Sequence, residues 1–377
     1  TISFRDIVIQ ERENDLVGAS FGRGFFVLDD YSALREMTEE NLSKKGKLFK
    51  PRDAKLFKPR NSLGNTGGQF YIAKNPTYGA VFTYHLSDVP STSKSKRMRS
   101  ERILNKDMKD IPFPGYEALA AEMEEKSASI ILTIKDSDGN HIRNIKKTAS
   151  KGSGKIAWNL RHKSYYPVRA GRSQSSWYYN PSGPYVTPGE YHAELFMEKD
   201  GTVEKLDGPI SFNVKPLRKG TLQGSSYDEY NSFRTKLSSL YIDISKYEDE
   251  FRLMDNKIQI LEKAAMQLET FSPEMLKKIA DMKNKYNKLE LEYESNPARD
   301  EIGEWDKVTL STRIRIAMQG LSTSYGPTEL NISNLDIAQK MFNDYKVVIE
   351  SLKSELENLE KEVKDLNPPH ISGSGIN

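Results

Sequence analysis

The first 30 residues, TISFRDIVIQERENDLVGASFGRGFFVLDD at positions 1–30, decide how the chain begins to fold. They contain three apolar runs, at 7–9, 16–20 and 25–28, and a Gly-Arg-Gly turn at 22–24 precedes the last run. Runs of β-branched and aromatic residues bounded by Gly and Asx predict a small antiparallel meander. About 25 residues of meander cannot bury a core alone. We therefore expect these strands to pair with strands outside this chain.

Short apolar runs with a period of two return from about residue 68. They lie at 69–73, 80–86, 129–135, 142–146, 155–160, 190–198 and 210–214. Turn sequences such as Asp136-Ser-Asp-Gly139 and Thr187-Pro-Gly189 separate several of them. About seven short strands with this spacing predict an immunoglobulin-like β-sandwich over residues 68–217, with Trp158 facing its core.

Two insertions interrupt this β-region, at residues 87–125 and 161–186. Both are longer than ordinary strand connections, so we expect surface features, with a helical stretch at 116–126 in the first.

The segment between the two β-regions has a different composition. Residues 31–38 predict a short helix that leaves the meander, which completes a first domain at 1–45. The string LFKPR then occurs at 48–52 and again at 56–60. Proline fixes its own φ angle and disfavours helix in the residue before it, so residues 46–67 predict an extended basic linker along the protein surface.

The apolar period changes to 3.6 residues after position 225. One stripe runs from Leu237 to Leu268 and predicts a helix of about 40 residues. Ser272 followed by Pro273 signals the start of a second helix. Further helices are predicted at about 305–322 and 333–366, so residues 225–366 predict a four-helix antiparallel bundle. The Pro/Gly/Ser-rich residues 367–377 predict a flexible tail. Ile242, Leu253 and Ile260 fall off the first stripe and suggest a docking face.

Two of these regions resemble a known family. The pattern D-L-V-x-A-S-F-G-R-G-F-F-V-L-D-D resembles the closing blade of the β-propeller in large bacterial sortilin-like proteins, which carry BNR repeats and are described as glycosyl hydrolase-like. The strings ILTIKDSDGNHIR, IAWNLR and GPYVTPGEYHAEL are similar to the FlgD-like immunoglobulin-like domain that follows the propeller there, and KNPTYGAVFTYHL resembles its first strand. The resemblance implies a multidomain β + α chain: a last propeller blade, a sandwich and a helical bundle.

Composition excludes several classes of function. The 377 residues include 56 basic and 53 acidic side chains, so the net charge of +3 gives no general argument for nucleic acid as a partner. No apolar run reaches the ~18 residues that a transmembrane helix needs. The absence of Cys excludes disulfides, thiol catalysis and Cys-ligated zinc. The five His residues show no zinc-ligand spacing.

Four motifs invite a chemical function that their context does not support. The stretch ASKGSGKI at 149–156 lacks the first Gly and the hydroxyl of a phosphate loop, and a hairpin turn suits it better. Asp136, Asp138 and Asn140 alternate as calcium ligands do, but the Gly and Glu of an EF-hand are missing, so we expect a β-turn.

Asp29 and Asp30 are neighbours on a strand and point to opposite faces, which does not suit a glycosidase pair. The basic run at 94–102 lacks interleaved aromatics and predicts a solvated loop.

The second insertion has the composition of a recognition loop. Its candidate partner-binding residues are Tyr165, Tyr166, Arg169, Arg172, Trp177, Tyr178 and Tyr179. Tyr, Trp and Arg dominate the energetics of protein interfaces, and flat aromatic rings also stack on sugars. The alternative is that the rings fold back and fix a long loop onto the sandwich or the bundle.

These observations predict a function without catalysis within this chain. Together with the resemblance, they lead us to expect a scaffold and protein-interaction region, and the resemblance implies a secreted or outer-membrane-associated protein of a Gram-negative bacterium. Its expected partners are upstream propeller blades and an envelope protein, with a glycan possible and no cofactor, catalytic residue or metal ligand. The alternative is a set of accessory domains of a carbohydrate-active enzyme whose catalytic site lies on upstream blades. A peptidase or chaperone-type accessory is a third possibility, since fold analogy does not carry function.

Overall fold

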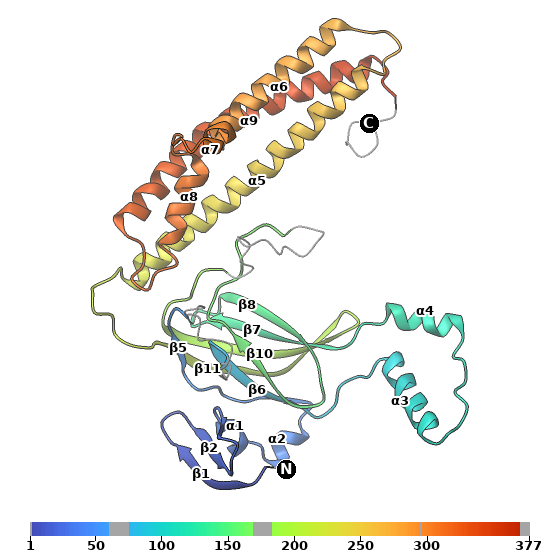
Figure 1. Ribbon diagram of the computed structural model, residues 1–377, viewed down its shortest axis with the longest axis vertical. Helices are drawn as coiled ribbons and strands as arrows, with labels where there is room; N and C mark the ends of the chain where they lie inside the picture. Colours follow the sequence, from blue (N-terminus) through green and yellow to red (C-terminus); the bar gives the residue numbers. More distant parts are fainter. Residues whose placement is uncertain (1, 60–74, 169–182, 295, 370–377) are drawn as a thin grey trace. The chain divides into compact units, whose positions relative to one another are not determined.

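The protein is a mixed α/β protein with several sheets, one of them curled as a half-barrel, and a helical C-terminal region (Figure 1). The computed structural model describes residues 2–59, 75–168, 183–294 and 296–369. It divides into two compact units, residues 1–163 with 185–219, and residues 164–184 with 220–377. The first unit carries the sheets and the second carries the long helices.

The predicted meander is present as a separate three-stranded sheet. Its strands are β1 (Phe4–Gln10), β2 (Asp15–Ser20) and β3 (Phe25–Leu28), in the order β1-β2-β3. Val8, Val17 and Val27 pair across the sheet, and both pairings are antiparallel. Two short helices follow, α1 (Ser32–Arg35) and α2 (Glu39–Ser43), in place of the single helix expected at 31–38.

Two further sheets make up the larger β-region. The three-stranded sheet has the order β4-β6-β9 and the five-stranded sheet the order β5-β11-β10-β7-β8. The strands are β4 (Gly46–Leu48), β5 (Ala54–Leu56), β6 (Ala80–Leu86), β7 (Ser129–Asp136), β8 (His141–Thr148), β9 (Gly152–Trp158), β10 (Gly189–Lys199) and β11 (Thr202–Pro216). Six of the seven predicted strands are thus present, and the one predicted at 69–73 lies outside the described residues.

The two sheets share one core. Phe82 on β6 meets Phe212 on β11 edge to face, with ring centroids 5.1 Å apart. Trp158 on β9 is fully buried, as predicted, and its ring lies 5.2 Å from Tyr191 on β10. Gly79 is required beside it, because its φ is +107° and a Cβ there would lie 2.0 Å from the Trp158 carbonyl oxygen.

The connection between β8 and β9 corrects the hairpin expected at 149–156. Strand β8 pairs with β7 and strand β9 pairs with β6, so the chain crosses from one sheet to the other at this point. Gly152 and Gly154 lie within β9, where backbone amides take part in the sheet.

The expectation of a surface linker at 46–67 is wrong for its described part. Strand β4 pairs with β6, and β5 pairs in parallel with β11, so this segment adds a strand to each sheet. Leu48 and Phe49 are fully buried, and the Leu48 N–H donates to Asp207 at 2.8 Å. Strands of three residues are too short to show a period of two, which is why the sequence did not reveal them.

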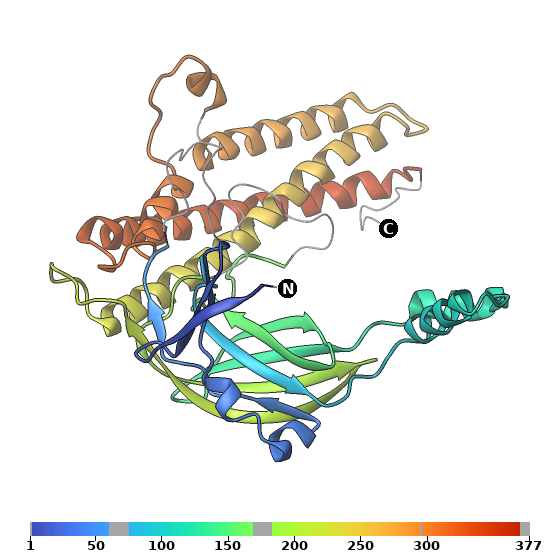
Figure 2. The same ribbon diagram turned by 60° about the horizontal axis from the view of Figure 1, so that its bottom comes forward.

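The first insertion forms two helices, α3 (Ser93–Lys106) and α4 (Tyr116–Glu124), joined by a loop (Figures 1 and 2). The basic run at 94–102 therefore lies on a helix, which corrects the predicted loop. Thr92 caps α3 by accepting from the Ser95 N–H at 3.1 Å. Arg97 donates to both carboxylate oxygens of Glu122 at 2.8 Å and so joins the two helices. Neither helix has a buried residue, as expected for a surface insertion.

The second unit contains four substantial helices, and each begins at a capping residue. They are α5 (Tyr227–Ala265), α6 (Pro273–Tyr293), α8 (Leu310–Gln319) and α9 (Glu329–Asp365), with a short α7 (Pro297–Glu301) between α6 and α8. Ser226 caps α5 in a capping box with Glu229, and Ser272 caps α6 ahead of Pro273 as predicted. The apolar stripes of these helices meet in one core.

The helices do not form the predicted antiparallel bundle of four. Cross-links between α5 and α9 pair Tyr247 with Glu350 and Glu250 with Lys353, each pair 103 residues apart, so the two helices run parallel. α6 runs antiparallel to both, since Lys283 pairs with Asp255 on α5 while Lys278 pairs with Glu362 and Lys285 with Glu355 on α9. α8 runs antiparallel to α9 beyond the point where α6 ends, since Arg313 bonds to Asn334 while Ile316, later in α8, accepts from Asn331, earlier in α9.

Helix length explains this arrangement. At about 1.5 Å per residue, α5 is roughly 58 Å long, whereas α6 is about 32 Å and α8 about 15 Å. Two short helices in succession therefore complete one layer beside α5 and α9. Figures 1 and 2 show α5, α6 and α9 side by side, with α8 beside the first part of α9.

Candidate functional site

The ends of the second insertion are held together within the first unit. Arg161 and Tyr185 form an isolated β-bridge, and the Arg161 guanidinium lies 3.7 Å from the centroid of the Tyr185 ring. Tyr185 also approaches Tyr78, with ring centroids 6.4 Å apart. These contacts anchor the base of the insertion, so Arg161 and Tyr185 have a structural role.

Tyr165 and Tyr166 pack against the first long helix. Their rings stack on each other with centroids 5.0 Å apart, and each meets Tyr241 of α5 edge to face at 5.2 Å. The alternative in which the rings fix the loop to the helices therefore holds for these two residues. The other candidates, Arg169, Arg172, Trp177, Tyr178 and Tyr179, lie outside the described residues.

The carboxylates weighed from the sequence have local roles. Asp136 accepts from the Asp138 and Asn140 N–H groups at 3.1 and 2.7 Å, which builds the predicted turn. Asp30 accepts from the Ser32 N–H at 3.2 Å, just after β3. Within the described ranges, no three His, Asp or Glu side chains gather as metal ligands. In the same part of the chain, no helix is long and apolar enough to cross a membrane.

The meander exposes apolar side chains on both of its faces. Successive residues of a strand point to opposite faces of the sheet. One face therefore carries Ile7, Ile9, Phe26 and Leu28, and the opposite face carries Val8, Phe25 and Val27. Ile7 is 58% exposed and Val8 is 56% exposed. Along the described chain, β1 and β3 each pair with β2 alone, which leaves the outer edges of the sheet open.

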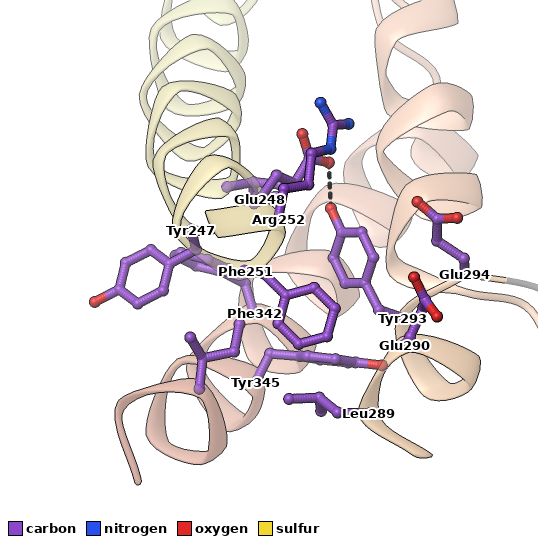
Figure 3. Close-up of a pocket in the computed structure, with 12 residues that line it drawn as sticks. Tyr247, Glu248, Phe251, Arg252, Leu289, Glu290, Tyr293, Glu294, Phe342 and Tyr345 are labelled. Carbon is purple, nitrogen blue, oxygen red and sulfur yellow. Dashed lines mark hydrogen bonds between the residues drawn. The ribbon is translucent and has the colours of Figure 1, made fainter. Parts of the chain in front are cut away.

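A cleft lies between α5, α6 and α9, at the last turn of α6 (Figure 3). Its volume is about 40 Å³. The walls are mostly aromatic and aliphatic, with three carboxylates and one guanidinium among them: Ile244, Tyr247, Glu248, Phe251, Arg252, Leu289, Glu290, Tyr293, Glu294, Phe342, Tyr345 and Ile349. The cleft exists because α6 ends at Tyr293 while α5 and α9 continue.

Aromatic contacts organise the walls of this cleft. Tyr293 meets Tyr345 edge to face with ring centroids 5.3 Å apart, and Phe342 meets Tyr247 in the same way at 5.3 Å. Phe251 stacks on Tyr286 at 4.1 Å. Edge-to-face and stacked contacts of this kind stabilise the positions of the rings that line the cleft.

Hydrogen bonding distinguishes the hydroxyls of Tyr293 and Tyr345 in the cleft. The Tyr293 hydroxyl donates to Glu248 across the cleft (Figure 3). Burial raises the pKa of Tyr293, and the nearby Glu248 carboxylate raises it further. Burial likewise raises the pKa of Tyr345, so both phenols stay protonated. Among the described residues the buried Tyr345 hydroxyl has no hydrogen-bond partner.

The sequence does not reveal this cleft, because its aromatic residues occupy the apolar stripes of helices, where burial in the core is the expectation. The signal that was available is the combination of Tyr293 with Glu290 and Glu294, immediately before the Asn296-Pro297 break.

No protein-family model matches this sequence, and comparison with curated proteins gives no match either.

Proposed function

We propose that this chain is a non-catalytic scaffold and protein-interaction region of a secreted or outer-membrane-associated bacterial propeller protein. The observation that carries the proposal is the meander β1–β3, which exposes apolar residues on both faces and whose two outer edges pair with no other described residue. A sheet that is apolar on both faces is suited to lie between two other layers. Exposed apolar surface of this extent is typical of an interface.

A propeller blade would satisfy these requirements. Blades are four-stranded sheets packed face to face around a central channel. Three antiparallel strands with open edges leave room for a fourth strand, and neighbouring blades would cover the two faces. Asp29 and Asp30 then end the blade, where Lys155 donates to the Asp29 carbonyl at 3.1 Å.

The second domain in the proposal is an immunoglobulin-like sandwich related to the FlgD-like type. Two sheets around one core, with Trp158 against Tyr191 and Phe212, support this assignment. The additional short strands β4 and β5 tie the domain to the segment that leaves the meander. In this arrangement the domain braces the propeller.

The test is co-purification of this chain with the remainder of its parent protein, expressed as a separate polypeptide. We expect a stable complex. Val8→Lys changes one face of the meander and Ile9→Lys changes the other, and each substitution should abolish the complex. Val203→Lys is the matched control, because Val203 is equally exposed but lies on β11 of another sheet. A complex that survives both meander substitutions contradicts the proposal.

The second candidate function is that of accessory domains of a carbohydrate-active enzyme. The aromatic composition of the second insertion is what favours it, since aromatic rings stack on sugars, whereas the rings of Tyr165 and Tyr166 themselves pack on Tyr241. A panel of glycosidase and peptidase substrates separates the two: turnover by the complex and not by this chain favours the accessory role. Turnover by this chain alone contradicts both candidates.

A further inference from the structure

We infer that the cleft between α5, α6 and α9 is a binding site for an alkylammonium group. The inference goes beyond the scaffold function and is independent of it, because it concerns only the helical unit. It depends on the aromatic walls, on the balance of charge at the mouth and on one buried hydroxyl without a partner.

The walls supply the faces and edges of aromatic rings. Phe251 comes from α5, Tyr293 from α6, and Phe342 and Tyr345 from α9, so three helices contribute rings to one small space (Figure 3). A cation within about 6 Å of a ring centroid is attracted by the ring quadrupole. Helix α6 already contains such a contact, since the Lys283 ammonium lies 4.9 Å from the centroid of the Tyr286 ring.

The mouth of the cleft is acidic. Glu248, Glu290 and Glu294 line it together with one cation, Arg252. Figure 3 shows the carboxylates of Glu290 and Glu294 beside Tyr293, while the Arg252 guanidinium points away from the rings. Three carboxylates against one guanidinium favour a cationic occupant over an anionic one.

The Tyr345 hydroxyl is a separate observation that indicates a ligand. Tyr345 is only 9% exposed, and its hydroxyl finds no hydrogen-bond partner in the described chain. Its ring crosses the floor of the cleft towards Leu289 of α6 (Figure 3). Burying a hydroxyl without a partner is unfavourable, and an ammonium N–H group would donate to its oxygen.

Size restricts the occupant further. The cleft volume of about 40 Å³ exceeds the space that a single water molecule requires. It suits an ammonium head with a short part of its alkyl stem. The apolar residues Ile244, Leu289 and Ile349 are placed to contact the stem.

The test is an NMR titration of the full chain, labelled on its tyrosine rings, with pentylammonium chloride. The uncharged 1-pentanol is the matched probe. We expect saturable shifts of the Tyr293 and Tyr345 signals, and roughly tenfold weaker binding of the alcohol. Glu248→Gln keeps an oxygen for the Tyr293 hydroxyl but removes the charge, so affinity should fall by about threefold to tenfold.

Two further variants make the result specific. Tyr345→Phe keeps the ring and removes only the hydroxyl, so it should also weaken binding while leaving the unfolding midpoint close to that of the wild type. Glu357→Gln removes an exposed carboxylate of α9 outside the cleft and should bind as the wild type does. A third probe, Nα-acetyl-lysine methylamide, carries the ammonium group on a lysine side chain, whereas pentylammonium is a free amine. Comparing their affinities shows which source the cleft prefers, and binding of either probe supports the inference.

Three results would overturn it: equal binding of pentylammonium and pentanol, unchanged affinity in Glu248→Gln, or no saturable shift of the tyrosine signals with either amine.

Discussion

The Tyr247 hydroxyl on α5 donates to the Glu350 carboxylate on α9 at 2.7 Å. One turn further along both helices, Lys353 lies 3.2 Å from Glu250, and two turns beyond that Lys257 lies 2.8 Å from Glu360. All three pairs share the same offset in sequence. They fix α5 and α9 in a parallel register over the middle of both helices.

This register is testable by cross-linking, because the chain has no Cys of its own. We expect a short bismaleimide to cross-link the double variant Glu250→Cys/Lys353→Cys rapidly. The control Glu250→Cys/Lys340→Cys moves the second site by 13 residues, about 20 Å along the helix, and should cross-link poorly. Faster reaction of the control pair would show that the helices are not in this register.

Trp158 should be a major contributor to the stability of the β-region. It is fully buried against Tyr191 and Phe212, and its Nε1–H donates to the Arg161 carbonyl at 2.9 Å. Trp158→Ala should therefore lower the free energy of unfolding by about 3–5 kcal/mol in a urea titration. Trp158→Phe should cost less, since it keeps most of the packing. A loss below about 1 kcal/mol for the alanine variant would contradict burial of the ring.

Glu194 should make stability depend on pH. Hydrogen bonds from Lys135 and Lys205 hold the pKa of its carboxyl below the ordinary value. A lowered folded-state pKa gives stability that is present above the unfolded pKa of about 4.3 and is lost as pH falls through the folded value. Glu194→Gln should thus cost about 1 kcal/mol at pH 7, where both lysines remain partly exposed.

The same comparison at low pH is the control. Below the folded pKa of Glu194, the wild type and Glu194→Gln should have similar stability in urea titrations. A cost that stays constant from pH 7 to acid pH would mean that packing, and not the ion pairs, stabilises this site.

Arg97 should hold the two helices of the first insertion together. Its guanidinium bonds to both oxygens of Glu122 on α4 and to Glu101 on α3 at 2.6 Å. Arg97→Ala should speed amide hydrogen exchange in residues 116–124. Arg102→Ala, on the same helix, should leave that exchange unchanged. Equal effects of the two variants would mean that general charge, and not this clamp, orders α4.

Long and strongly patterned elements of this fold could be predicted from the sequence. The strands around Trp158 alternate apolar and polar residues. Ser272-Pro273 predicts the start of α6, because an N-cap serine and a proline at the first helical position affect only the adjacent turn. Elements that depend on distant partners could not. Strands β4 and β5 are only three residues each, and they exist because β6 and β11 offer edges to pair with.

The helical topology and the cleft depend on such distant partners too. Apolar stripes show which face of a helix is buried, but they do not say which neighbour covers it. α5 and α9 run parallel because α6 and α8 together form one layer beside them. The apolar stripe of any single helix does not reveal this arrangement. The cleft then follows from the end of α6 at Tyr293, where rings of the stripe are left partly uncovered.

The central claim of the proposed function is that β1–β3 is a sheet that further strands, from the proposed propeller, would complete. Hydrogen exchange measured on this chain alone and on a longer protein that carries the proposed propeller blades tests it most directly. We expect the β1 and β3 amides to exchange far faster than those of β10 in this chain, because their outer edges are open. In the longer protein the same amides should become protected to the level of β10. Equal protection of β1–β3 and β10 in this chain alone, or no gain of protection in the longer protein, would contradict the claim.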